Sequence, residues 1–167
     1  MAVSLLNFNS KMFVGDTVPV TAGDLPAYHT VVNGREVLVF PDGSDEYAAV
    51  TKAIAMPQQY AAGTLTAKIH YISAATTGDN NIEVYVEAVT DGDAVDLDSA
   101  TSFDSVNDST TTVPGTAGHL DVISVTLTNK DSVAAGDMVR FMVRRDSDDA
   151  GDTAAADFRL ILLEIQE

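Results

Sequence analysis

The sequence predicts an all-β fold, an antiparallel β-sandwich of jelly-roll type with about seven or eight strands and an irregular N-terminal arm. Three observations predict it. Apolar and polar residues alternate with period two in several segments. Turn residues separate these segments at short intervals. The long polar connection of residues 91–118 suits a crossing between two sheets better than a hairpin. A chain of 167 residues that is 46% apolar can bury one core.

The N-terminal segment differs in texture from the rest of the chain. Residues 1–35 contain glycines and prolines at short intervals, with only brief apolar stretches between them, at Gly15, Pro19, Gly23, Pro26 and Gly34. Such a segment is typical of a loosely structured arm with at most one or two short edge strands. We therefore expect two parts, an arm over residues 1–35 and a sandwich domain over residues 36–167.

The strands of the domain follow from periodicity. Residues 64–73, 81–89 and 137–145 alternate, and their apolar sets (Leu65, Ala67, Ile69, Tyr71; Ile82, Val84, Val86, Ala88; Val139, Phe141, Val143) are expected to face the core. The segment 158–165 is apolar on both faces, as expected of a central strand that is covered twice. Further strands are expected at residues 36–40, 47–55 and 120–128.

The charge balance excludes several partners. The chain has 25 acidic and 9 basic residues, a formal charge of −16. This field repels phosphate backbones and anionic membrane surfaces, so we expect neither nucleic acid nor a membrane as a partner. No apolar run reaches the roughly 20 residues that span a bilayer. The first residues lack the features of a signal peptide, so we expect synthesis in a cytoplasm.

No motif in the sequence indicates catalysis. The chain has no cysteine, which excludes disulfides, thiolate zinc sites and cysteine nucleophiles. Its three histidines, His29, His70 and His119, are scattered, and neither a nucleophile elbow nor a zinc-protease helix is present. We therefore predict that the protein is not an enzyme, with no catalytic and no cofactor-binding residues.

Two acidic loops, Asp91–Asp98 and Asp146–Thr153, leave two interpretations open. Closely spaced carboxylates can supply the oxygens that Ca²⁺ requires. Aspartates also close turns by accepting bonds from their own backbone, which is a sufficient reason for them here. Neither loop has the EF-hand spacing. Turn chemistry is the preferred interpretation, and the candidate calcium ligands are Asp91, Asp93, Asp96, Asp146, Asp148 and Asp152.

Three stretches in order resemble a group of virion proteins from tailed bacteriophages. They are the opening Met56–Leu65, the strand Gly78–Val86 and the ending Phe141–Leu160 with its Arg144-Arg145-Asp146 run. The resemblance implies a small jelly-roll component of the particle, often trimeric, found as head decoration or as the particle-binding part of fibres. It also implies a homotrimer in the virion, bound to the major capsid protein or another virion protein. In the ending, the two arginines can form bidentate bonds with neighbouring carboxylates and fix the return of the last strand.

The leading functional prediction is therefore a capsid decoration protein. The alternative is a receptor- or glycan-binding module attached to a tail, neck or fibre, which a sugar-binding pocket at Tyr28, Tyr60 or Tyr85 would favour. Under the leading prediction, the arm is expected to become ordered on a neighbouring subunit.

Overall fold

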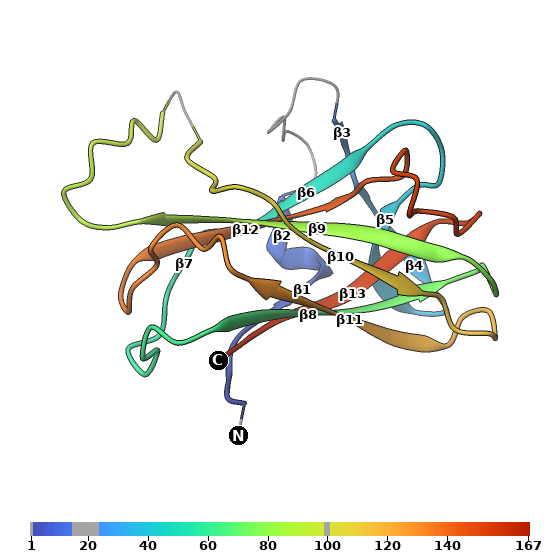
Figure 1. Cartoon of the computed structure of the whole chain (residues 1–167), viewed down its shortest axis with the longest axis horizontal. Helices are drawn as coiled ribbons and strands as arrows, with labels where there is room; N and C mark the ends of the chain where they lie inside the picture. Colours follow the sequence, from blue (N-terminus) through green and yellow to red (C-terminus); the bar gives the residue numbers. More distant parts are fainter. Residues whose placement is uncertain (1, 15–23, 99–100) are drawn as a thin grey trace.

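The computed structural model describes residues 2–14, 24–98 and 101–167, and it confirms the β-sandwich (Figure 1). Two sheets face each other as two layers. The first sheet has the order β11-β8-β13-β5-β4, and β1 also pairs with β13; the second has the order β10-β9-β12-β6-β2, with β3 beside β6 and β7 beside β12. All pairs are antiparallel except the short β3–β6 pair.

The described residues form thirteen strands. The first sheet contains β1 (Ser4–Asn9), β4 (Tyr28–Val32), β5 (Arg35–Phe40), β8 (Leu65–Ser73), β11 (Leu120–Leu127) and β13 (Phe158–Gln166). The second contains β2 (Phe13–Val14), β3 (Leu25–Pro26), β6 (Tyr47–Thr51), β7 (Ile54–Ala55), β9 (Asp79–Val89), β10 (Asn107–Thr112) and β12 (Met138–Arg145). A single 3-10 turn, η1 (Ser10–Met12), joins β1 to β2. None of the helical structure in these residues is long and apolar enough to span a bilayer.

The alternating residues fill the space between the sheets. The predicted inward sets of β8, β9 and β12 are all buried in one apolar core. At one end of that core, Phe158 stacks on Tyr71 with ring centroids 4.5 Å apart and meets Phe40 edge-on at 5.8 Å. Burial of apolar side chains, these aromatic ones included, is the main source of stability in such a fold.

The predicted strands all form, with two differences. The segment 47–55 divides into β6 and β7. The connection 91–118 contains a strand, β10, which pairs with β9 in the second sheet. The crossing to the first sheet therefore follows β10 and occupies residues 113–119.

The N-terminal segment is not irregular where the structure describes it. β1 pairs with β13, and Leu6 and Phe8 lie in the core, with the Phe8 ring 5.7 Å from that of Phe141. The boundary expected at residue 36 also falls inside the β4–β5 hairpin. The physical reason is that β1 has an apolar face which finds its partner at the other end of the chain. Of the arm predicted over residues 1–35, residue 1 and residues 15–23 lie outside the described residues.

The two ends of the described chain are joined by backbone hydrogen bonds. Val3 N donates to Glu167 O at 2.7 Å, and Glu167 N donates to Val3 O at 2.9 Å. Figure 1 shows the two ends side by side.

Candidate binding groove and charged clusters

A hollow of about 510 Å³ lies on the exposed face of the first sheet. It is formed by the β4–β5 hairpin, β8, β13 and the residues that begin β11. Its lining residues are Val32, Asn33, Arg35, Ile72, Gly118, Leu120, Arg159 and Ile161. We call this hollow the groove. Its volume lies within the range of roughly 300–1,000 Å³ typical of ligand sites.

Strand register extends the groove into a row that crosses the sheet. Leu120 lies opposite Ile72, which lies opposite Arg159. Arg159 in turn lies opposite Val39, which lies opposite Tyr28. Paired residues share a face, and Phe158 and Leu160 on either side of Arg159 point into the core, so the row lies on the face away from the core. Within the row, Val39 is buried, with 2% of its surface exposed. Leu120 and Tyr28, at the two ends of the row, are 60% and 50% exposed.

The groove combines apolar and cationic side chains. Ile72, Ile161 and Leu120 offer aliphatic surface, and Arg35 and Arg159 offer guanidinium donors at the rim. Arg159 lies 3.7 Å from Asp157, and both side chains are partly exposed, so the pair contributes little to stability and leaves donors for a ligand. This arrangement suits binding through van der Waals contact and hydrogen bonds.

The corresponding face of the second sheet is covered by the chain itself. Phe103 packs there with Met142 and Tyr85, and its ring lies 5.4 Å from the guanidinium of Arg140. A hydrogen bond links the covering segment to β9: Ser102 N donates to Glu87 Oε1 at 2.9 Å. The first sheet therefore presents the more open of the two outer faces.

The three tyrosines proposed for a sugar pocket lie apart. Tyr60 is buried, and its hydroxyl accepts a bond from Lys130 Nζ at 2.8 Å. Tyr85 donates to Glu83 at 2.9 Å, and burial together with this bond raises its pKa. Only Tyr28 of the three belongs to the row on the open face.

The first acidic loop uses two of its carboxylates to close turns. Asp93 accepts a bond from Thr90 N at 2.7 Å, and Asp96 accepts one from Asp98 N at 3.1 Å. Among the described residues, Asp91, Asp93 and Asp96 belong to no group of three potential ligands close enough to hold one ion. These contacts are the turn chemistry that the sequence favoured.

The second acidic loop divides its carboxylates between two partners. Asp152 forms a bidentate pair with Arg145, through Nε at 2.9 Å and Nη2 at 2.7 Å, and both side chains are buried. Asp152 also accepts a bond from Asn81 N at 3.0 Å. Arg145 further donates to the carbonyl oxygens of Ala154 and Ala156 at 2.8 Å each. The predicted role of this ending, which is to fix the last strand, agrees with these contacts.

Asp146 and Asp148 lie next to the carboxylate of Glu46, the residue that precedes β6. One oxygen of each lies within 4.8 Å of the others, so the three could contact one cation. Burial, followed by a bond to Asp24, raises the pKa of Glu46 to about 7. Burial, followed by a bond to Asp148, raises that of Asp146 to about 6. The sequence missed Glu46, which lies 100 residues from Asp146.

Arg144, a buried residue on the face of β12 that points away from the main core, partly neutralises this cluster. Its guanidinium contacts Glu83 and Glu46 and lies 3.4 Å from Asp24 and 3.6 Å from Asp146. Burial lowers the pKa of Arg144, but its hydrogen bond and its attraction to Glu83 raise the pKa by more. The net shift is upward, so the side chain stays charged.

The three histidines lie on different elements. His29 is on β4 and exposed, His70 is on β8 with Nε2 3.7 Å from Glu164, and His119 precedes β11. None of the hydrogen bonds of the described residues joins a histidine to a serine or threonine hydroxyl in the way a nucleophile and its base require.

The comparisons with known proteins concern the fold. No family model matches the chain, and no curated protein sequence matches it. Among solved structures, it is similar to the Clostridium thermocellum xylanase Xyn10B CBM22-1–GH10 modules complexed with xylohexaose (TM-score 0.51, 13% identity). That match covers 99% of this chain and 28% of the xylanase chain.

Two further structures match over most of both chains. The CBM22-1 xylan-binding domain of Paenibacillus barcinonensis Xyn10C gives a TM-score of 0.48 at 9% identity, covering 99% of this chain and 94% of that domain. The mannan-binding module TmCBM27 gives 0.46 at 9%, covering 100% and 99%. At these identities the likeness concerns the fold alone. The chain therefore forms a jelly-roll-like β-sandwich that resembles carbohydrate-binding modules.

Proposed function

We propose that this domain is a non-catalytic binding module that holds an extended glycan in the groove on the first sheet. The observation that supports it is the row of accessible side chains in the groove, Leu120, Ile72 and Arg159, which crosses three neighbouring strands on the more open of the two outer faces. A row of this kind can contact several units of a linear ligand at once.

The chemistry of the groove matches that of a sugar chain. Sugar rings present apolar C–H faces, which fit the aliphatic floor at Ile72 and Ile161, and hydroxyls, which accept bonds from Arg35 and Arg159. Tyr28 adds an exposed aromatic ring at the edge. The xylanase modules that match with a TM-score of 0.51 were determined in complex with xylohexaose, which makes glycans the first ligands to test.

The test is isothermal titration of the protein with a panel of oligosaccharides, neutral and acidic, each of about six units. We expect saturable binding of at least one member, weakened about fivefold or more by Leu120→Ser, because that change removes exposed aliphatic surface from the groove. Leu97→Ser is the matched control, since Leu97 is 52% exposed but lies outside the groove. Absence of binding to every oligosaccharide, or equal loss in both variants, would contradict the proposal.

A second candidate is the particle-decoration function, supported by the exposed apolar side chains around the same hairpin. Val31 is 61% exposed and Leu120 is 60% exposed, and such residues can join two protein surfaces. In this case the groove contacts a second copy or a virion protein such as the major capsid protein. Light scattering after size exclusion distinguishes the two: a trimer that Leu120→Ser dissociates favours decoration, and a monomer favours the glycan module.

A further inference from the structure

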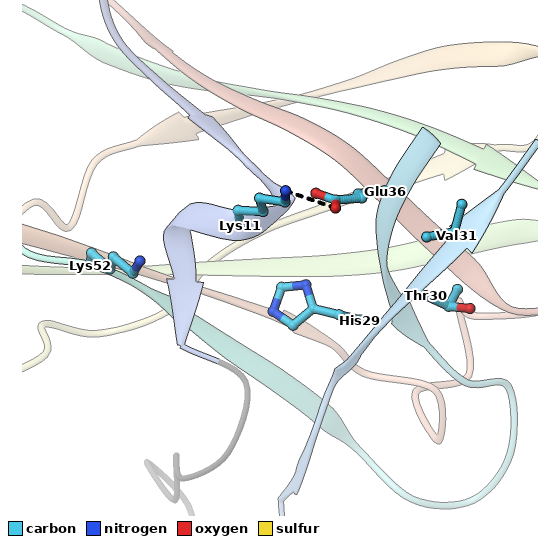
Figure 2. A pocket seen from close by; sticks show the side chains of 6 residues that line it. All are labelled: Lys11, His29, Thr30, Val31, Glu36 and Lys52. Atoms are coloured by element: carbon cyan, nitrogen blue, oxygen red, sulfur yellow. Dashed lines mark ion pairs between the residues drawn. The ribbon is translucent and has the colours of Figure 1, made fainter. Parts of the chain in front are cut away.

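A second hollow, of about 460 Å³, lies beside the β4–β5 hairpin (Figure 2). Lys11, His29, Thr30, Val31, Glu36 and Lys52 line it. In the hairpin, Val31 pairs with Glu36 and Val32 pairs with Arg35. Since successive pairs face opposite sides of a sheet, the hairpin presents Glu36 to this hollow and Arg35 to the groove.

Three separate elements bring the basic side chains of this hollow together. Lys11 lies in η1, which is capped by Asn9 Oδ1 accepting from Lys11 N at 3.1 Å. Lys52 follows β6, and its backbone N donates to Met12 O at 2.6 Å, which places it beside η1. Figure 2 shows the Lys52 side chain and the His29 ring directed toward each other, with Lys11 extending to Glu36 beside them.

Glu36, the one acidic residue among the described residues of the hollow, already has a partner. Glu36 Oε1 lies 2.8 Å from Lys11 Nζ, and these side chains are 43% and 70% exposed. A pair so exposed to water is weak, so a ligand can replace it at small cost. In the part of the chain that the structure describes, Lys52 makes no ion pair.

The charge of the two hollows is opposite to that of the whole chain. Among the residues that the structure describes, the linings of the two hollows include four lysines and arginines, at positions 11, 35, 52 and 159, and one acidic residue, Glu36. The three arginines of β12, in the second sheet, are paired with carboxylates: Arg140 and Arg144 with Glu87 and Glu83 of β9, and Arg145 with Asp152 of the following loop. Positive charge that is available to a ligand therefore gathers around the β4–β5 hairpin.

Building on the proposed function, we infer that the glycan is an acidic one and that the hollow at Lys11 and Lys52 binds the carboxylate of a uronic acid unit. A linear glycan that passes over the edge strand β4 reaches both hollows. It can place one carboxylate in the groove and another in the hollow at Lys11 and Lys52. Ammonium and guanidinium groups bind carboxylates through charge-assisted hydrogen bonds. A protein of net charge −16 repels such a polymer everywhere else, so the hairpin also determines where the polymer lands.

The experiment measures binding of hexagalacturonate, xylohexaose and a hexaglutamate peptide by titration calorimetry at low and at physiological salt. We expect hexagalacturonate to bind at least tenfold more tightly than the other two, with an affinity that falls as salt rises. Lys52→Gln should weaken it about threefold to fivefold, the range for loss of one exposed charge contact. Lys68→Gln is the matched control, because Lys68 is a lysine of the first sheet outside both hollows. Circular dichroism checks that both variants keep the fold.

The outcomes separate this inference from the proposed function. Tighter binding of xylohexaose, unaffected by Lys52→Gln, would leave a glycan module but overturn the acidic ligand. Equal binding of hexaglutamate would show recognition of charge alone and would also overturn it. Binding of neither sugar would overturn the acidic ligand, and absence of binding to every oligosaccharide of the wider panel would refute the proposed function itself. Equal effects of the two lysine variants would remove the hollow from the site.

Discussion

The buried ion pair between Arg145 and Asp152 gives the sharpest test of how the last strand is fixed. Both side chains are excluded from water, with 0% and 1% exposed. Asp152→Ala removes two hydrogen bonds to the guanidinium and one from Asn81 N. The remaining carboxylate near Arg145 is Asp42, at 3.2 Å and 39% exposed, which compensates only in part.

The loss of stability in Asp152→Ala follows from the buried charge of Arg145 that remains without its partner. Removing one partner of a buried pair leaves an uncompensated charge and costs about 3–5 kcal/mol, whereas an exposed pair is worth less than about 1 kcal/mol. We therefore expect Asp152→Ala to lower the free energy of unfolding by about 3 kcal/mol or more. For a chain of this size that corresponds to a fall in melting temperature of roughly 6–12 °C.

Urea unfolding followed by circular dichroism measures the effect as a lower midpoint with an unchanged slope. Asp152→Asn keeps the size of the side chain and one acceptor oxygen, so it should fall between the wild type and the alanine variant. Asp108→Ala, at an exposed position of β10, is the control and should change stability by less than about 0.5 kcal/mol. A loss below about 1 kcal/mol for Asp152→Ala would refute the reasoning, because it would place the pair among exposed ones.

Three further predictions test other parts of the fold. Phe8→Ala should cost about 3–5 kcal/mol in urea unfolding, because Phe8 is fully buried against Phe141, whereas the exposed Val3→Ala should cost almost nothing. Glu46 and Asp146 have raised pKa values, about 7 and about 6 against ordinary values of 4.5 and 3.8. Between these values the folded state retains protons that the unfolded chain has lost, so the free energy of unfolding should fall as pH rises from about 4 to 7. Glu46→Gln should flatten that decline. A wild-type profile that rises over this range would contradict the assignment. If the cluster binds calcium, as the sequence leaves open, calcium at ten times its Kd should raise the melting temperature by roughly 3–6 °C over EDTA, and Asp146→Asn should abolish the rise; an identical melt in both solutions would exclude the ion.

Local pattern was sufficient for the strands that alternate. Leu65–Ser73 is buried at every second residue, as its sequence predicts, because one of its faces meets the core and the other meets water. The strand β10, Asn107–Thr112, has no apolar alternation and lies beside β9 at the end of the second sheet, so periodicity could not find it. β1 was missed for another reason, since its partner is more than 150 residues away.

A stronger local signal was present in the N-terminal segment. Asn33-Gly34 is the dipeptide of a tight hairpin, and both residues have positive φ, 48° and 77°. The glycines and prolines around it favoured an irregular arm instead. The hairpin that this dipeptide closes separates the two candidate hollows, so its loss from the prediction also hid the site.

The sequence signal for the groove was the apolar outer face of the last strand, which was interpreted as a covered face instead of a binding face. The last strand was expected to be covered on both faces because it is apolar on both. β13 is central in its sheet, but Ile161 and Leu162 on its outer face are only half-buried. Surplus apolar residues on a strand can thus indicate a binding face as well as a covering layer, and only the three-dimensional arrangement distinguishes the two. The buried state of Arg145 was likewise invisible, because a charged residue near a strand end is usually exposed.

The backbone pairing of Val3 with Glu167 makes the domain suited to circular permutation and to insertion into another protein. Because the two ends meet at one place, a linker of a few residues could close the chain into a circle, and new termini could open at an exposed turn such as Gly115 without changing any strand pair. The same closeness lets the domain sit within a surface loop of another protein, entered and left through one point. A permutant opened at Gly115 that melts near the parent temperature would show that strand pairing, rather than chain order, maintains this sandwich.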